Sequence, residues 1–264
     1  LEFITYIIKM NVRSFKVFTC MPYEATGRAI LRMMEFSSET SSILTFHAED
    51  GPLLKYMHER FCNSKEQIAV HKARPPEAEE LAIYKVGIYS ILTKAKVHIA
   101  HLSSVKGLNV LRTLKKRGAD ITAETAPHYL VFTRKDVERW GPYLKLAPSL
   151  KFEIDREELW KGLQDGTIDM VATDHAPCPR EEKDVGYEDP WKAWGGIPGL
   201  ATMVPLIFTY GVLTKRISLS RFVDIVTRNA AKRFGLYNKG VAMIGYDADL
   251  AVLDTKNMRM VGKE

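Results

Sequence analysis

Five short apolar runs recur along the first two thirds of the chain, and a stretch with helical spacing of its apolar residues follows each of them. The runs lack polar alternation, which is typical of strands covered on both faces in a parallel sheet. The predicted strands are residues 14–18, 43–49, 96–103, 120–126 and 168–174, and the predicted helices are residues 24–36, 53–61, 76–92, 105–117 and 156–164. This order predicts an α/β fold built from βα units.

The last third of the chain has a different pattern. Residues 175–192 are rich in proline, glycine and charge, which predicts a long loop over a site. Residues 200–211 and 219–234 have the spacing of amphipathic helices. Residues 239–254 combine turn residues with a short β-type run, so we expect the edge of a small accessory sheet there.

Side chains of the kind that bind metals lie in or near the ends of the predicted strands. They are Lys16 within the first strand, then His47, His101, Glu124 and Asp174. Because the catalytic groups of a (β/α)8 barrel lie at the carboxyl ends of several strands, this placement favours such a barrel. Imidazole and carboxylate together suit zinc or a similar divalent ion, which lowers the pKa of a bound water to about 7. Asp174 would then both bind the ion and accept a proton from that water.

Lys16 is unusual because a charged lysine inside an apolar strand carries a desolvation cost. Addition of CO₂ to its amine would give a carbamate, an anion able to bridge two cations. The alternative is that Lys16 extends to solvent at the rim of the barrel. A strand-end histidine alone is more often a hydrogen-bonded core residue, and ATDHAP alone fits an ordinary turn. The combination of these residues favours the metal site.

Composition narrows the class of protein. The 264 residues include 38 Lys+Arg and 32 Asp+Glu, and the excess of +6 is spread along the chain. No basic stripe with interleaved aromatics is present, so we expect no nucleic-acid partner. The cysteines at 20, 62 and 178 are too scattered for a disulfide framework, which predicts a cytoplasmic protein. No apolar run approaches the roughly 18 residues of a membrane span, so no membrane partner is expected.

Nine motifs carry a resemblance to a known family. They are SFKVF with Lys16, HAED with His47, ARPPEAEELAI, HIAHLSS with His101, ETAPHYL, LAPSLK, ATDHAPCP with Asp174, WGGIPGL, and NAAKRFGLY through GYDADLAVLD. In this order the chain resembles the cyclic amidohydrolases of the amidohydrolase superfamily: dihydroorotase, allantoinase and hydantoinase (dihydropyrimidinase). The resemblance implies an α/β fold of the TIM-barrel (β/α)8 type.

The resemblance also implies roles for individual residues. Lys16 would be the carboxylated lysine that bridges two metals, His47 and His101 would bind the second metal, and Asp174 would be metal ligand and general base. The substrate-binding residues would be His128, Tyr129, Ala147 and Gly196. We interpret His98 as structural, because strand alternation would point it away from the face of His101. His175 is expected to be a hydrogen-bond partner behind the site.

The implied activity is hydrolysis of the C–N bond of a small cyclic amide or ureide by a homo-oligomer. Zinc is the expected cofactor, two ions in the full-length family site, with Mn²⁺, Co²⁺ and Fe²⁺ left open. The expected reaction is dihydroorotase-like, from dihydroorotate to N-carbamoyl-aspartate. Allantoinase stays open because Cys178 and KAWGG resemble it. Hydantoinase stays open because SFKVF resembles it, although Met21 stands where the hydantoinase pattern has a tyrosine and Tyr23 follows two residues later.

One family motif is absent. The family places a His-x-His pair on its first barrel strand, and no two of the seven histidines here are two positions apart. If SFKVF is the fourth strand, residues 1–237 form a partial barrel of about strands 4–8, and residues 238–264 form a piece of an accessory β-sandwich. Leu1 as first residue fits part of a longer protein. A non-catalytic scaffold or partner subunit is therefore the alternative function.

Overall fold

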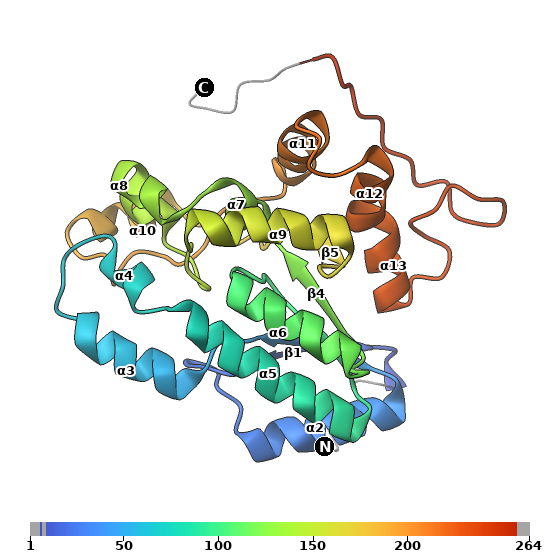
Figure 1. The fold of residues 1–264 in the computed structure, drawn as a ribbon, viewed down its shortest axis with the longest axis horizontal. Helices are drawn as coiled ribbons and strands as arrows, with labels where there is room; N and C mark the ends of the chain where they lie inside the picture. The colour runs from blue at the N-terminus through green and yellow to red at the C-terminus, as the bar shows by residue number, and fades with distance from the viewer. Residues whose placement is uncertain (1–5, 7–8, 258–264) are drawn as a thin grey trace.

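A parallel five-stranded sheet organises the fold, with its strands in chain order. Figure 1 shows how the helices and strands are arranged. The computed structural model describes residue 6 and residues 9–257. The strands are β1 (Ser14–Phe18), β2 (Ile43–His47), β3 (Lys96–Ile99), β4 (Ile121–Thr125) and β5 (Met170–Val171). All five predicted strands are therefore confirmed. Four of them end earlier than predicted, so several of the polar residues expected at strand ends lie in the turns that follow.

Helices connect the strands as predicted, and each predicted helix is confirmed within a few residues. These helices are α2 (Gly27–Thr40), α3 (Gly51–Phe61), α5 (Pro76–Thr93), α6 (Val105–Lys116) and α9 (Glu153–Asp165). The side chains of Thr26, Asp50 and Ser104 accept hydrogen bonds from the first turns of α2, α3 and α6. These N-caps satisfy backbone N–H groups that have no partner within the helix.

Shorter helices occupy the loops between these elements. They are α4 (Ala69–Lys72), α7 (Pro127–Val131), α8 (Val137–Trp140) and α10 (Arg180–Asp184), with the 3₁₀ turns η1 (Arg134–Asp136), η2 (Gly141–Leu144) and η3 (Val185–Tyr187). The predicted loop 175–192 thus contains α10 and η3. The two predicted C-terminal helices form in segments: α11 (Met203–Ile207) with η4 (Phe208–Leu213), then α12 (Leu219–Val223), η5 (Asp224–Arg228) and α13 (Asn229–Phe234).

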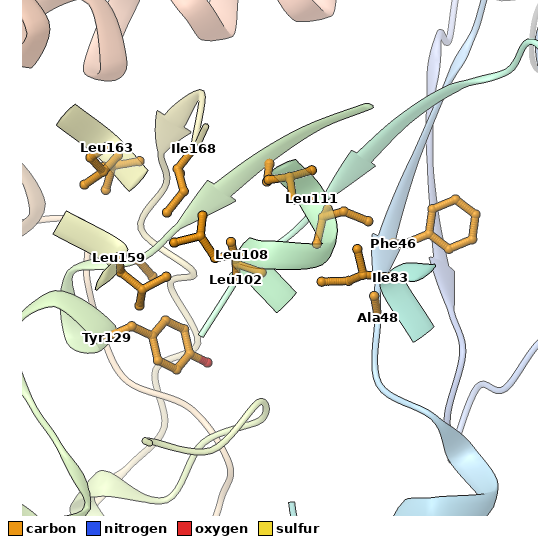
Figure 2. Packing of buried hydrophobic residues seen from close by; sticks show 14 of the residues in the cluster. Phe46, Ala48, Ile83, Leu102, Leu108, Leu111, Tyr129, Leu159, Leu163 and Ile168 are labelled. Atoms are coloured by element: carbon orange, nitrogen blue, oxygen red, sulfur yellow. The ribbon is translucent and has the colours of Figure 1, made fainter. Parts of the chain in front are cut away.

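The hydrophobic core lies between one face of the sheet and helices α2, α5 and α6. Phe46 of β2, Ile83 of α5 and Leu111 of α6 are completely buried there (Figure 2). Ile99 of β3 is completely buried as well. Helices α5 and α6 pack very closely, because a Cβ at Gly87 would lie 2.2 Å from Leu114 Cδ1. A glycine is therefore required at that crossing.

The opposite face of the sheet is polar. Lys16 pairs in register with Thr45, Thr45 with His98, and His98 with Thr122. Register partners in a parallel sheet point to the same face, so these four side chains form one row. Within the described residues β1 and β5 are the edges of the sheet. An α/β fold with a parallel sheet is thus established, and the partial TIM barrel stays a prediction that this strand order fits.

The C-terminal segment differs from its prediction. No strand forms in residues 235–257, and the side chains of Ile244 and Val252 are fully exposed. The β segment predicted for residues 239–254 is therefore wrong, because no neighbouring strand among the described residues lies there to share its backbone hydrogen bonds. Figure 1 shows this segment, in red, running along the outside of the molecule. The rest of the predicted accessory piece, residues 258–264, lies outside the described residues.

Among residues 9–257, none of the helices is both long enough and apolar enough to cross a bilayer.

Candidate active site

Two histidines from neighbouring strands meet at the carboxyl edge of the sheet. His47 ends β2 and His101 lies two residues beyond β3, and the centroids of their rings are 4.6 Å apart. Both side chains are buried. The ring of His47 also stacks on Phe18 of β1, with centroids 5.2 Å apart. Three strands of the sheet thus fix this histidine pair in place.

The backbone is unusual at two of the predicted metal ligands. His101 has a φ of 43° and Asp174 a φ of 45°. Such left-handed conformations are uncommon outside glycine, and strained residues of this kind cluster at functional sites. In both cases the residue follows a strand and leaves its regular alternation. The side chains can therefore turn toward the same edge of the sheet.

Hydrogen bonds from two motifs hold the turn that carries His101. The N–H of Leu102 donates to the carbonyl of Glu124 at 2.8 Å, and Thr125 Oγ1 donates to the carbonyl of Leu102 at 2.7 Å. The buried carboxylate of Glu79, in ARPPEAEE, accepts from the N–H of Ser103 at 2.9 Å. Glu79 thereby positions HLSS without reaching the site itself.

Asp174 lies close to His128 and to two other charged groups. His128 Nε2 is 3.8 Å from Asp174 Oδ2. Burial raises the pKa of Asp174, nearby Lys16 opposes this shift, and Glu124 adds to it. Burial lowers the pKa of His128 to about 3, so its imidazole is neutral at pH 7. A carboxylate with a raised pKa is suited to accept and return a proton.

Lys16 lies in β1, as predicted, and of the two alternatives left open for its side chain the structure shows the exposed one. Its side chain is exposed, and its Nζ lies 5.6 Å from the centroid of the Phe18 ring. Partial enclosure by the protein still lowers the pKa of Lys16, against the attraction of Glu124 and Asp174. A lowered pKa leaves more of the amine neutral, which is the form that reacts with CO₂.

A buried ion pair lies behind His47. His47 Nε2 is 2.8 Å from Glu49 Oε2, and Arg74 Nη1 donates to the same oxygen. Burial acts to raise the pKa of Glu49, but Arg74 and His47 outweigh it and the pKa is strongly lowered. A carboxylate on one ring nitrogen fixes the tautomer of a ligand histidine and leaves the other nitrogen free to bind a metal.

The residues present fit a divalent metal in one of two ways. One way uses the predicted set of Lys16, His47, His101 and Asp174, in which His101 Nδ1 is buried without a hydrogen-bond partner among the described residues. Nε2 of the predicted substrate residue His128 is buried and unpartnered in the same way. Cys20, His47 and Glu49 also offer ligand atoms within 4.8 Å of one another. However, burial and then Glu49 raise the pKa of Cys20 to about 12, which disfavours the thiolate that a metal needs. His47 belongs to both sets.

The predicted substrate residues lie around one loop. The hydroxyl of Tyr129 donates to the carbonyl of Pro148 at 2.7 Å, so this side chain holds the loop next to Ala147. The N–H of Gly196 donates to the carbonyl of Lys145 at 3.0 Å. A Cβ at Gly196 would lie 2.6 Å from the carbonyl oxygen of Ala176, so only glycine fits. Ala147 lines a cavity of about 540 Å³.

Two interpretations of histidines require correction. His98 shares the face of Lys16, because β3 ends at Ile99 and alternation does not continue to His101. Its ring is completely buried, with Nε2 3.1 Å from Glu124 Oε2. His175 does not lie behind the site, because it is exposed and its Nδ1 accepts from the N–H of Gly199 at 3.0 Å.

Three residues near the site were given no specific role from the sequence, although Glu124 was expected at a strand end. Glu124 is a strand-end carboxylate whose charge acts on both Lys16 and Asp174. Glu49 and Arg74 occur in the motifs HAED and ARPPEAEE. The sequence shows an acidic and a basic residue in these motifs. It does not show that they form an ion pair, because the two residues are 25 positions apart and only the fold brings them together.

Comparison with known proteins shows the family of the chain. The sequence profile of the amidohydrolase family matches residues 5–263. The chain belongs to the amidohydrolase family. It is 33% identical to L-hydantoinase of Paenarthrobacter aurescens over 81% of this chain and 47% of that relative. It is 35% identical to dihydroorotase of Acetivibrio thermocellus over 84% of this chain and 51% of that relative.

Other members of the amidohydrolase family show similar likeness. Allantoinase of Bacillus licheniformis is 32% identical over 83% of this chain and 48% of the relative. The structure of D-hydantoinase from Bacillus sp. AR9 superposes with a TM-score of 0.90 and 28% identity, over 94% of this chain and 56% of that one. The chain thus spans about half the length of the relatives it matches. The relatives of similar sequence identity are named for three different enzyme activities: hydantoinase, allantoinase and dihydroorotase.

Proposed function

We propose that this amidohydrolase catalyses the metal-dependent ring opening of a cyclic amide or ureide. The observation that carries the proposal is the gathering of His47, His101 and Asp174 at one edge of the sheet, with Lys16 on the same polar face. Hydantoinase, allantoinase and dihydroorotase relatives support the choice of a cyclic amide.

Lys16, as a carbamate, with His47, His101 and Asp174 would hold the metal, and zinc fits these imidazole and carboxylate donors. When bound, such an ion supplies Lewis-acid activation of water and of the amide carbonyl. Asp174 takes the proton from the attacking water and delivers it to the leaving ring nitrogen. Its raised pKa suits both transfers. Glu49 and Arg74 keep His47 in one tautomer and orientation.

The first substrate to test is dihydroorotate, which would open to N-carbamoyl-aspartate. Allantoin and dihydrouracil are the alternatives, because the named relatives divide between these activities. Dihydroorotate differs from the other two rings by its carboxylate. The cationic side chains of Arg74 and Lys145 in the adjoining cavity favour a substrate with that charge.

The test measures metal content and ring opening on the purified protein, before and after removal of metal by a chelator. We expect bound zinc, turnover of one of the three rings, and recovery of activity when zinc is restored. Replacing Asp174 by Asn removes the proton acceptor and should lower turnover by about 10²–10⁴-fold. Asp254→Asn, in the exposed C-terminal segment, is the matched control and should have no effect.

Absence of both bound metal and turnover of all three rings would contradict the proposal. That result would favour the second candidate function, a non-catalytic scaffold or partner subunit. The absence of a His-x-His pair from this chain is the observation that keeps this candidate in view.

A further inference from the structure

A cavity of about 540 Å³ adjoins the candidate active site but contains none of its predicted metal ligands. Its volume falls within the usual range for ligand pockets, about 300–1,000 Å³. The cavity reaches the predicted substrate loop through Ala147, and Gly195 next to Gly196 also lines it. Arg74 lies in its wall and is joined to His47 through Glu49. The wall of the cavity is therefore linked to His47 through Arg74 and Glu49.

The charge of the cavity wall has one sign. Its charged lining residues are Lys55, Arg74 and Lys145, and no aspartate or glutamate is among the lining residues of the described part of the chain. Most of the other lining residues are apolar, Leu54 and Trp191 among them. A ligand that suits this wall has an apolar body and a negative charge.

The cations of the wall retain free hydrogen-bond donors. Lys145 Nζ donates to the carbonyl of Trp191 at 2.6 Å. Two of the three ammonium protons are thus left for hydrogen bonds to a ligand. Arg74 donates to Glu49 through Nη1, and a guanidinium has five donors in all. Burial, then Lys183 and Arg74, lower the pKa of Lys145 to about 8. Asp189 opposes this shift, and an anion beside Lys145 would stabilise its protonated form further.

We propose that this cavity binds the exocyclic arm of the substrate, and that it selects a cyclic amide whose arm ends in a carboxylate. The inference rests on the proposed function, which places the amide ring at the metal ligands. The ring lies over His47 and Asp174, and the arm extends past Ala147 to Lys145 and Arg74. The carboxylate receives charge-assisted hydrogen bonds from these two side chains, which are stronger than those of a neutral amide.

The test compares two probes of nearly equal size, hydantoin-5-propionate and its neutral primary amide, hydantoin-5-propionamide. Trp191 lines the cavity, so its fluorescence reports occupancy, and Trp191→Phe identifies the part of the signal that comes from it. We expect the carboxylate to bind the zinc-loaded protein with a Kd at least about tenfold lower than that of the amide.

Variants assign that preference to the cavity. The preference is measured as the Kd of the amide divided by the Kd of the carboxylate. Lys145→Met should reduce this ratio to nearly one, and Lys145→Arg should retain most of it. This pair of variants separates loss of charge from misfolding. Lys55→Met should lower the ratio by a smaller factor, because Lys55 is exposed at the cavity mouth. Lys135→Met, an exposed lysine outside the lining, is the matched control.

The inference is overturned if the two probes bind equally, if neither binds, or if the preference survives in Lys145→Met. Binding without any change in Trp191 fluorescence also overturns it. Its failure is distinguishable from failure of the proposed function. If both probes are hydrolysed with equal kcat/KM, the proposed function stands and the role of the cavity in selecting a carboxylate is contradicted. If binding depends on Lys145 but no ring is hydrolysed, the anion site stands and the proposed hydrolase activity is contradicted.

Discussion

Alternate residues of the same strands form the two faces of the five-stranded sheet. One face stabilises the fold, and the other carries polar residues of the candidate site. On the helix-covered face, Phe46, Ile99 and Ala123 are completely buried among apolar neighbours. On the other face, Lys16 and His98 stand in one polar row. Burial of apolar area stabilises the fold without regard to direction. The polar face depends on exact partners, so small changes there alter chemistry more than stability.

The largest expected effect is loss of a core side chain on the helix-covered face. Phe46→Ala should lower the free energy of unfolding by about 3–5 kcal/mol, because it removes a buried ring and leaves a cavity. Thr45→Ala, one residue away and on the polar face, should cost less than about 1 kcal/mol. Urea unfolding of both variants measures the difference. Equal losses would contradict the division of labour between the faces.

The next effect comes from the ion pair behind His47. Arg74→Met leaves the buried carboxylate of Glu49 without its guanidinium, and should cost about 3 kcal/mol. Adding Glu49→Gln removes the uncompensated charge and should recover part of the loss. Urea unfolding of the single and double variants measures the recovery. A single variant as stable as the parent protein would show that Glu49 does not need Arg74.

A smaller effect depends on pH. Burial, then Arg134 and Lys151, lower the pKa of His71 to about 3, whereas the unfolded value is near 6.5. Between these values the unfolded state binds the proton and the folded state does not, so stability falls as pH falls below about 6.5. His71→Leu should make this slope shallower by about 1 kcal/mol per pH unit.

Unfolding of the metal-free protein between about pH 7 and about pH 4 measures this slope. His128, whose pKa burial also lowers to about 3, should maintain a residual slope in the variant. An unchanged slope in His71→Leu would show that His71 binds its proton equally well in the folded and unfolded states.

The smallest effect on stability is expected at Lys16, where the effect on metal is large. Lys16→Met should change the free energy of unfolding by no more than about 0.5 kcal/mol, because the side chain is exposed. Bound zinc after dialysis should fall. Lys96→Met is the matched control, because Lys96 shares the polar face at the amino end of β3 and should keep the metal. A similar loss of zinc in both variants would show that Lys16 has no specific role in binding the metal.

The local pattern of apolar and polar residues was enough to predict much of the secondary structure. Apolar runs and helical spacing located all five strands and the five main helices, because both periodicities are set by residues a few positions apart. The motifs that resemble cyclic amidohydrolases also named His47 and His101, whose rings the fold brings together, and Asp174, which lies beside His128. Family membership followed from the order of these motifs.

Tertiary structure decided what depends on distant partners. The face occupied by His98 depends on where β3 ends, and the exposure of Lys16 depends on what covers the sheet. Residues 239–254 have a β-type pattern without a neighbouring strand, so the pattern alone misled. The pairing of Glu49 with Arg74, and a cationic cavity assembled from five separate segments, join residues far apart in the chain. Sequence periodicity reports the neighbours of a residue along the chain, whereas burial and charge pairing are set by its neighbours in space.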